Sequence, residues 1–70
     1  MTEYAVIYEQ AEDGSWGAYV PDLPGCVSGG DTREEVEANM AEAIPFHLAG
    51  LRETGRNVPK PHSFAGVVAV

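Results

Sequence analysis

The chain has 70 residues, a single cysteine and a formal net charge of −7. A chain this short forms one small domain with a limited core, and Cys26 has no second cysteine with which to form a disulfide. The acidic excess disfavours direct binding to DNA or RNA, because phosphate recognition relies on Lys and Arg. Cys26, His47 and His62 lack the paired spacing of a zinc site, so we expect no metal and no cofactor.

Small domains usually need a disulfide, a metal ion or self-association for stability. Since the first two are not expected here, residues 1–70 are expected to form a single domain that self-associates into a dimer or tetramer. No charged and then apolar leader opens the chain, and no apolar run approaches the length of about 18 residues that a membrane span needs. A lone cysteine is typical of a reducing compartment. We therefore expect a soluble cytoplasmic protein that does not bind membranes.

The first part of the chain predicts three antiparallel strands. Residues 4–8 are β-branched and aromatic, and Asp13-Gly14 is a strong signal for a hairpin turn into a second strand at 16–20. The prolines and the glycine of residues 21–25 predict a rigid loop, followed by a short third strand at 26–28.

The pattern then becomes helical. Asp31-Thr32 followed by Glu34-Glu35 offers helix caps, and Gly55 suits the C-terminal cap. One apolar stripe at helical spacing comprises Val36, Met40, Ile44, Leu48 and Leu51. Pro45 interrupts the pattern without shifting its phase, which predicts one kinked helix rather than two.

Residues 64–70 predict a final strand, so the fold class is α+β with the order β-β-β-α-β. A right-handed crossover would place this strand parallel to the first one, in a mixed sheet of order 3-2-1-4 with the long helix on one face. That is a partial ribonuclease-H-like topology.

This topology raises the possibility of a metal-dependent nuclease, which needs converging carboxylates. The final strand contains none, and Asp22 and Asp31 lie on loops. A Cys26–His47 thiolate pair is the other catalytic possibility, but a buried cysteine and a half-buried structural histidine are the favoured interpretation. The sequence therefore indicates a binding protein without catalytic residues.

Several segments together resemble the HicB family of antitoxins. They are residues 4–6, 16–26, 30–32, 42–44 and 47–48, with Glu53-x-Gly55 and Val58-Pro59-x-Pro61. The resemblance implies an antitoxin that neutralises a HicA-like RNA-cleaving toxin by direct contact, and it implies a homo-oligomer. A small basic toxin would complement the acidic first half of the chain.

Typical members of that family continue into a DNA-binding domain, whereas this sequence ends at Val70, so promoter binding is in doubt. We expect either a short stand-alone form or a separate protein that supplies DNA binding. The alternative is an oligomeric binding or regulatory module of the same fold, with an unknown protein partner and no catalytic activity.

Two groups of contact residues are predicted. For the partner they are Asp22, Leu23 and Pro24 at an exposed loop tip, Glu34 and Glu37 at the helix start, and Phe46 opposite the apolar stripe. Simpler explanations stay open: the loop residues form only a turn, the two glutamates only cap the helix and face solvent, and the position of Phe46 reflects a shift in helical phase at the kink. For self-association they are Phe64, Val67, Val68 and Val70, because both faces of the final strand are apolar and need cover.

Overall fold

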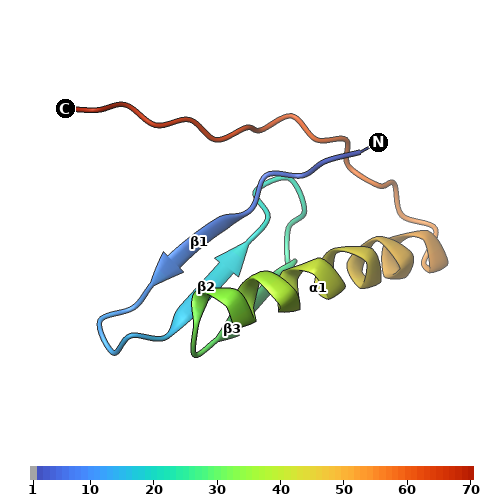
Figure 1. The fold of residues 1–70 in the computed structure, drawn as a ribbon. Helices are drawn as coiled ribbons and strands as arrows, with labels where there is room; N and C mark the ends of the chain where they lie inside the picture. Colours follow the sequence, from blue (N-terminus) through green and yellow to red (C-terminus); the bar gives the residue numbers. More distant parts are fainter. Residues whose placement is uncertain (1) are drawn as a thin grey trace.

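The computed structural model describes residues 2–70. Its regular elements are three strands, β1 (Ile7–Gln10), β2 (Trp16–Tyr19) and β3 (Val27–Gly30), and one helix, α1 (Arg33–Glu53). The strands form an antiparallel sheet in the order β1-β2-β3. The helix lies across one face of this sheet, and the chain then returns as a long extended segment (Figure 1). The predicted α+β class and the three-stranded meander are confirmed.

The β1–β2 hairpin forms where the sequence predicts it. Gly14 adopts a φ of 91°, a backbone conformation that other residues rarely take. The Asp13 carboxylate accepts hydrogen bonds from the backbone N–H and the hydroxyl of Ser15, at 3.0 and 2.6 Å. These contacts fix the register in which Tyr8 lies opposite Ala18.

The first strand begins later than predicted, at Ile7 rather than at residue 4. Continuing the register toward the N-terminus would bring Ala5 opposite Pro21, which has no N–H to donate to a neighbouring strand. Tyr4 instead reaches the segment after the helix, where its hydroxyl donates to the Pro59 carbonyl at 2.6 Å.

Helix α1 runs without a break through Pro45, as one helix. Its N-cap is Thr32, whose hydroxyl accepts the Glu35 N–H at 3.1 Å. At the other end Gly55 has a φ of 72°, and the N–H of Arg56 donates to the Leu51 carbonyl at 2.9 Å. That pairing is the Schellman arrangement, so the predicted C-terminal cap is confirmed.

The core lies between the sheet and α1. Its buried apolar residues are Ala18, Val20, Leu23, Cys26, Val36 and Met40. The rest of the predicted stripe, Ile44, Leu48 and Leu51, packs against this core and is partly buried. Gly30 permits close approach of helix and sheet, because a Cβ there would lie 3.2 Å from Glu35 Cβ and from the Val36 nitrogen.

The predicted fourth strand is wrong as an element of this sheet. Residues 64–70 are extended, but within the described residues 2–70 they pair with no strand, so the 3-2-1-4 order and the ribonuclease-H-like topology are not formed. The segment begins beside the N-terminus and then runs separately from β1 (Figure 1). Residues 62–63, immediately before it, are held by contacts with the β2–β3 loop.

Candidate partner-binding surface

Asp22, in the β2–β3 loop, is a buried carboxylate that holds the chain after the helix. Its Oδ2 accepts the backbone N–H groups of His62 and Ser63, both at 2.9 Å. Its Oδ1 accepts the Ser63 hydroxyl at 2.7 Å, and the His62 Nε2 lies 3.2 Å from the same oxygen. Only 1% of the Asp22 side chain is exposed, so these partners replace water around the carboxylate.

Burial alone would raise the pKa of Asp22. The hydrogen bonds from the His62 backbone and from Ser63, together with the nearby His62 ring, outweigh burial and hold the pKa below its ordinary value of 3.8. Asp22 is therefore ionised at neutral pH and acts as a fixed anionic clamp on residues 62–63. His62 and Ser63 were missed by the sequence analysis, since nothing in their local pattern indicates a partner 40 positions earlier.

The expected exposed tip of this loop is wrong for two of its three residues. Leu23 is completely buried and Asp22 is 3% exposed, while Pro24 is exposed. Two consecutive turns that share Leu23 fold the loop inward: the Leu23 N–H donates to the Val20 carbonyl at 3.1 Å, and the Leu23 carbonyl accepts the Cys26 N–H at 3.0 Å. Leu23 therefore supports the core, and of the three residues only Pro24 is positioned to meet a partner.

The start of α1 carries an exposed acidic surface. Glu34 and Glu37 are both exposed, and Glu37 forms an ion pair with Arg33 at 3.2 Å. Exposed pairs of this kind stabilise a helix only slightly. Glu34 also lies in the first turn, where negative charge favours the helix. Contact of either residue with a partner stays a prediction.

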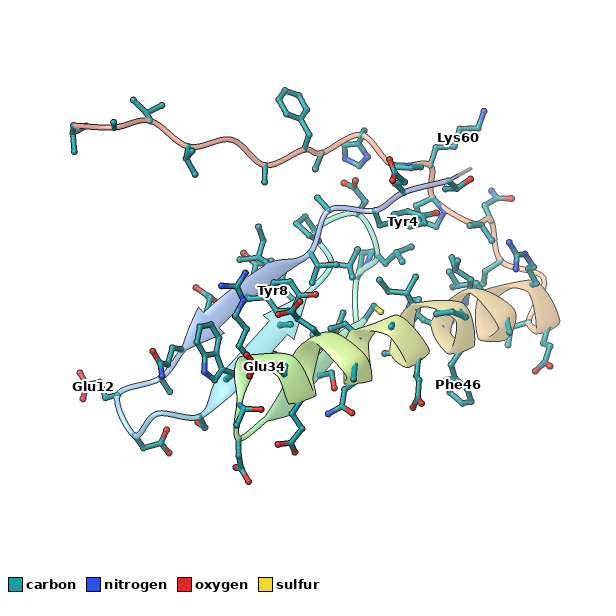
Figure 2. The ribbon with its side chains drawn as sticks, viewed as in Figure 1. Tyr4, Tyr8, Glu12, Glu34, Phe46 and Lys60 are labelled. Carbon is teal, nitrogen blue, oxygen red and sulfur yellow. The ribbon has the colours of Figure 1, made fainter. Side chains whose placement is uncertain are left out.

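Phe46 projects from α1 away from the sheet (Figure 2) and is 83% exposed, as the sequence predicts. It lies beside a shallow depression that Val27, Ala43 and His47 also line. Val27, at the start of β3, is 64% exposed. An exposed aromatic side chain beside an exposed valine is a feature of binding surfaces, where large apolar side chains act as anchors.

Cys26 and His47 line that same depression, so the structure places the two residues of the thiolate alternative near each other. Burial raises the pKa of the Cys26 thiol, which is the opposite of the shift that activates a nucleophile. Within residues 2–70, no cluster of three or more His, Cys, Asp or Glu side chains could hold a metal ion. None of the helices in that part of the chain is long and apolar enough to cross a membrane.

A cavity separate from the depression beside Phe46 was not predicted from the sequence. It has a volume of about 480 Å³ and lies between the N-terminal segment, the end of α1 and residues 58–61. Tyr4, Leu48 and Pro59 supply apolar walls, and Arg52 and Lys60 place two of the chain's four cationic side chains at this cavity.

These features describe a small α+β domain with an acidic helix start and an exposed aromatic side chain. The model of the HicB-like antitoxins of bacterial toxin–antitoxin systems matches residues 4–70. The chain therefore belongs to the HicB-like antitoxin family. A crystal structure of the N-terminal domain of the antitoxin HicB from Burkholderia pseudomallei is similar, with a TM-score of 0.71 and 32% identity over 84% of this chain and 69% of that one.

Three relatives illustrate the range of lengths. A UPF0150 protein of Thermoplasma acidophilum is 34% identical over 87% of this chain and 88% of its own length. A 14.9 kDa protein of Haemophilus phage HP1 is 44% identical over 81% of this chain, and antitoxin HicB 2 of Photorhabdus laumondii is 38% identical over 83%. The matched regions span 42% and 41% of the lengths of these last two relatives.

Proposed function

We propose that this protein is the antitoxin of a toxin–antitoxin pair and that it neutralises a small, basic, HicA-like RNA-cleaving toxin by direct contact. The observation that carries the proposal is the family match over residues 4–70, together with the shared fold of an antitoxin domain that is 32% identical. In this role the chain binds and occludes its partner and performs no chemistry of its own.

The charge distribution supports a basic partner. The chain carries a net charge of −7, and Glu34 and Glu37 are exposed at the same end of α1. Opposite potentials accelerate the encounter of two proteins and select the correct partner. Phe46 and Pro24 offer exposed apolar side chains at which a bound toxin would exclude water.

Co-expression tests the proposal. The chain is produced together with the product of the neighbouring reading frame, and growth and co-purification are measured. We expect the neighbouring product alone to arrest growth, and the pair to restore growth and to purify as one complex. Arrest without rescue, or rescue without a complex, would contradict neutralisation by contact and would favour the alternative of an oligomeric module with another partner.

The proposed contact surface is tested by association kinetics at low salt. The double variant Glu34→Arg/Glu37→Arg should associate with the toxin more slowly than the parent chain, because steering charges act mainly on the association rate. Glu9→Arg/Glu12→Arg is the matched control, since it changes the net charge by the same amount at two exposed positions outside α1; Glu12 lies at the turn between β1 and β2 (Figure 2). Equal association rates for the parent and the double variant would exclude the helix start as the steering surface.

A further inference from the structure

The cavity between the N-terminal segment, the end of α1 and residues 58–61, here called the connector cavity, has the size of a small-molecule site. Its volume of about 480 Å³ lies within the range of about 300–1,000 Å³ that ligand pockets occupy. Its apolar walls include Tyr4, Leu48, Val58 and Pro59, all of them partly buried. An apolar group placed against these walls would remove further apolar surface from water, which favours binding.

Contacts on two sides hold the walls of the connector cavity in place. The Tyr4 hydroxyl donates to the Pro59 carbonyl at 2.6 Å and so joins the N-terminal segment to residues 58–61. Pro59 and Pro61 each fix one backbone dihedral angle. The next two residues along the chain are hydrogen-bonded to the buried carboxylate of Asp22. Because the walls are already ordered, a ligand pays little conformational entropy to bind there.

Arg52 and Lys60 bring positive charge to the connector cavity that no carboxylate of the domain neutralises directly. Both side chains are exposed, and within residues 2–70 neither forms an ion pair, whereas Arg33 is paired with Glu37 at 3.2 Å. Glu3 also lines the cavity. Two cations and one carboxylate leave one net positive charge, in a chain whose net charge is −7.

These charges favour a ligand with a single carboxylate. The guanidinium of Arg52 presents planar N–H donors that match the two oxygens of a carboxylate. Lys60 extends from the chain on a flexible stem (Figure 2), so its ammonium can approach the same group. A doubly charged phosphate would carry more negative charge than the cavity compensates, because Glu3 repels it.

We propose that the connector cavity binds a small monocarboxylate whose apolar body packs against Tyr4, Leu48 and Pro59. Arg52 pairs with the carboxylate, and Lys60 supplies the second cation. A ligand of about a dozen non-hydrogen atoms, held partly by an exposed ion pair, binds with a Kd of about 1 mM. This proposal does not depend on the antitoxin role.

An NMR titration of the full chain with 3-phenylpropionate at neutral pH tests the site. The methyl resonances of Leu48 and Val58 should shift and saturate together. Those of Val67, Val68 and Val70, exposed apolar residues outside the cavity, are the internal control and should stay in place. Absence of a saturable shift at Leu48 and Val58, or equal shifts at the control positions, would overturn the proposal.

The neutral amide 3-phenylpropanamide separates the contribution of the charge from that of the apolar body. It should bind about 10-fold more weakly than the acid, because the charge-assisted hydrogen bonds are lost. Equal affinities for the acid and the amide would show that the cavity takes any apolar ligand of this size, which would contradict selection of a carboxylate.

A pair of double variants assigns the two cations. Arg52→Gln/Lys60→Gln should weaken binding of the acid about 10-fold and leave binding of the amide unchanged. Arg33→Gln/Arg56→Gln is the matched control, because it removes the other two cationic side chains and changes the net charge equally. All four residues are exposed, so both variants should keep the fold, which circular dichroism verifies. Equal weakening in both variants would show an effect of overall charge and would overturn the assignment.

Discussion

The backbone N–H of Ser63 donates to the buried carboxylate of Asp22 at 2.9 Å, across 41 positions of the chain. Asp22 lies in the loop between β2 and β3, and Ser63 follows the connector after α1. A single side chain thus joins the β2–β3 loop to residues 62–63. The loop and these two residues are therefore expected to respond together to any change at Asp22.

Asp22→Asn should release residues 62–63 from the loop. The amide oxygen can still accept both backbone N–H groups, but these hydrogen bonds lose the negative charge that strengthens them, and the amide nitrogen can no longer accept from the Ser63 hydroxyl. Amide hydrogen exchange of His62 and Ser63 should become faster, while that of α1 should stay unchanged. Equal protection of these two amides in both chains would show that residues 62–63 are held by other contacts.

The clamp should depend on pH in one direction. The folded-state pKa of Asp22 is lowered from 3.8, so its stabilising contribution is complete at neutral pH and is lost as the pH falls through the folded-state value. The Ser63 amide resonance, followed by NMR, should show a transition below the ordinary range of an Asp carboxyl.

Two variants assign that transition. Asp22→Asn should remove it, and His62→Gln, which replaces the titratable ring that contacts the carboxylate, should retain it. A transition that survives in Asp22→Asn would belong to another group.

Leu23→Ala should destabilise the domain strongly, although the residue lies in a Pro- and Gly-rich loop. Leu23 is completely buried, and removing a buried leucine typically costs about 2–5 kcal/mol because a cavity remains. Phe46→Ala is the control: it removes a larger side chain that is 83% exposed and should change stability by no more than about 0.5 kcal/mol. Urea unfolding, monitored by circular dichroism, measures both.

Thr32→Ala should weaken the start of α1. The Thr32 hydroxyl accepts the Glu35 N–H at 3.1 Å, and loss of such a cap typically costs about 1 kcal/mol. Thr2→Ala, at an exposed position outside the helix, should have no effect on the free energy of unfolding. Similar unfolding midpoints for the parent and the Thr32→Ala chains would show that another group caps the helix.

Cys26 should be unreactive in the folded protein. The thiol is buried and burial raises its pKa, so little thiolate forms at neutral pH. A thiol-specific reagent should label it only after denaturation. Rapid labelling of the native chain would reopen the interpretation of Cys26 and His47 as a reactive pair.

Local sequence signals predicted the local parts of this fold. Thr32 and Gly55 each act through backbone groups a few positions away, and both caps form as expected. The apolar stripe from Val36 to Leu51 faces the core for the same reason, since helical periodicity is a local property.

Contacts between residues far apart in the sequence could not be predicted from such local signals. The loop at residues 21–25 has the composition of an exposed turn, yet Leu23 fills the core, and Asp22 is buried because His62 and Ser63 supply its hydrogen-bond donors. The fourth strand was expected because residues 64–70 have strand composition, but composition does not specify a pairing partner. Of the predicted contact residues, the helix positions Glu34, Glu37 and Phe46 are exposed, while two of the three loop positions are not.

The contacts of Asp22 with residues 62–63 and of Tyr4 with Pro59 also bear on the order of folding. They join positions 40 to 55 residues apart, whereas the hairpin and the helix caps close over a few residues. During folding the sheet and α1 can therefore form before residues 62–63 reach the Asp22 carboxylate. The domain would pass through a stage in which that carboxylate is solvated by water, and docking of residues 62–63 would complete the structure.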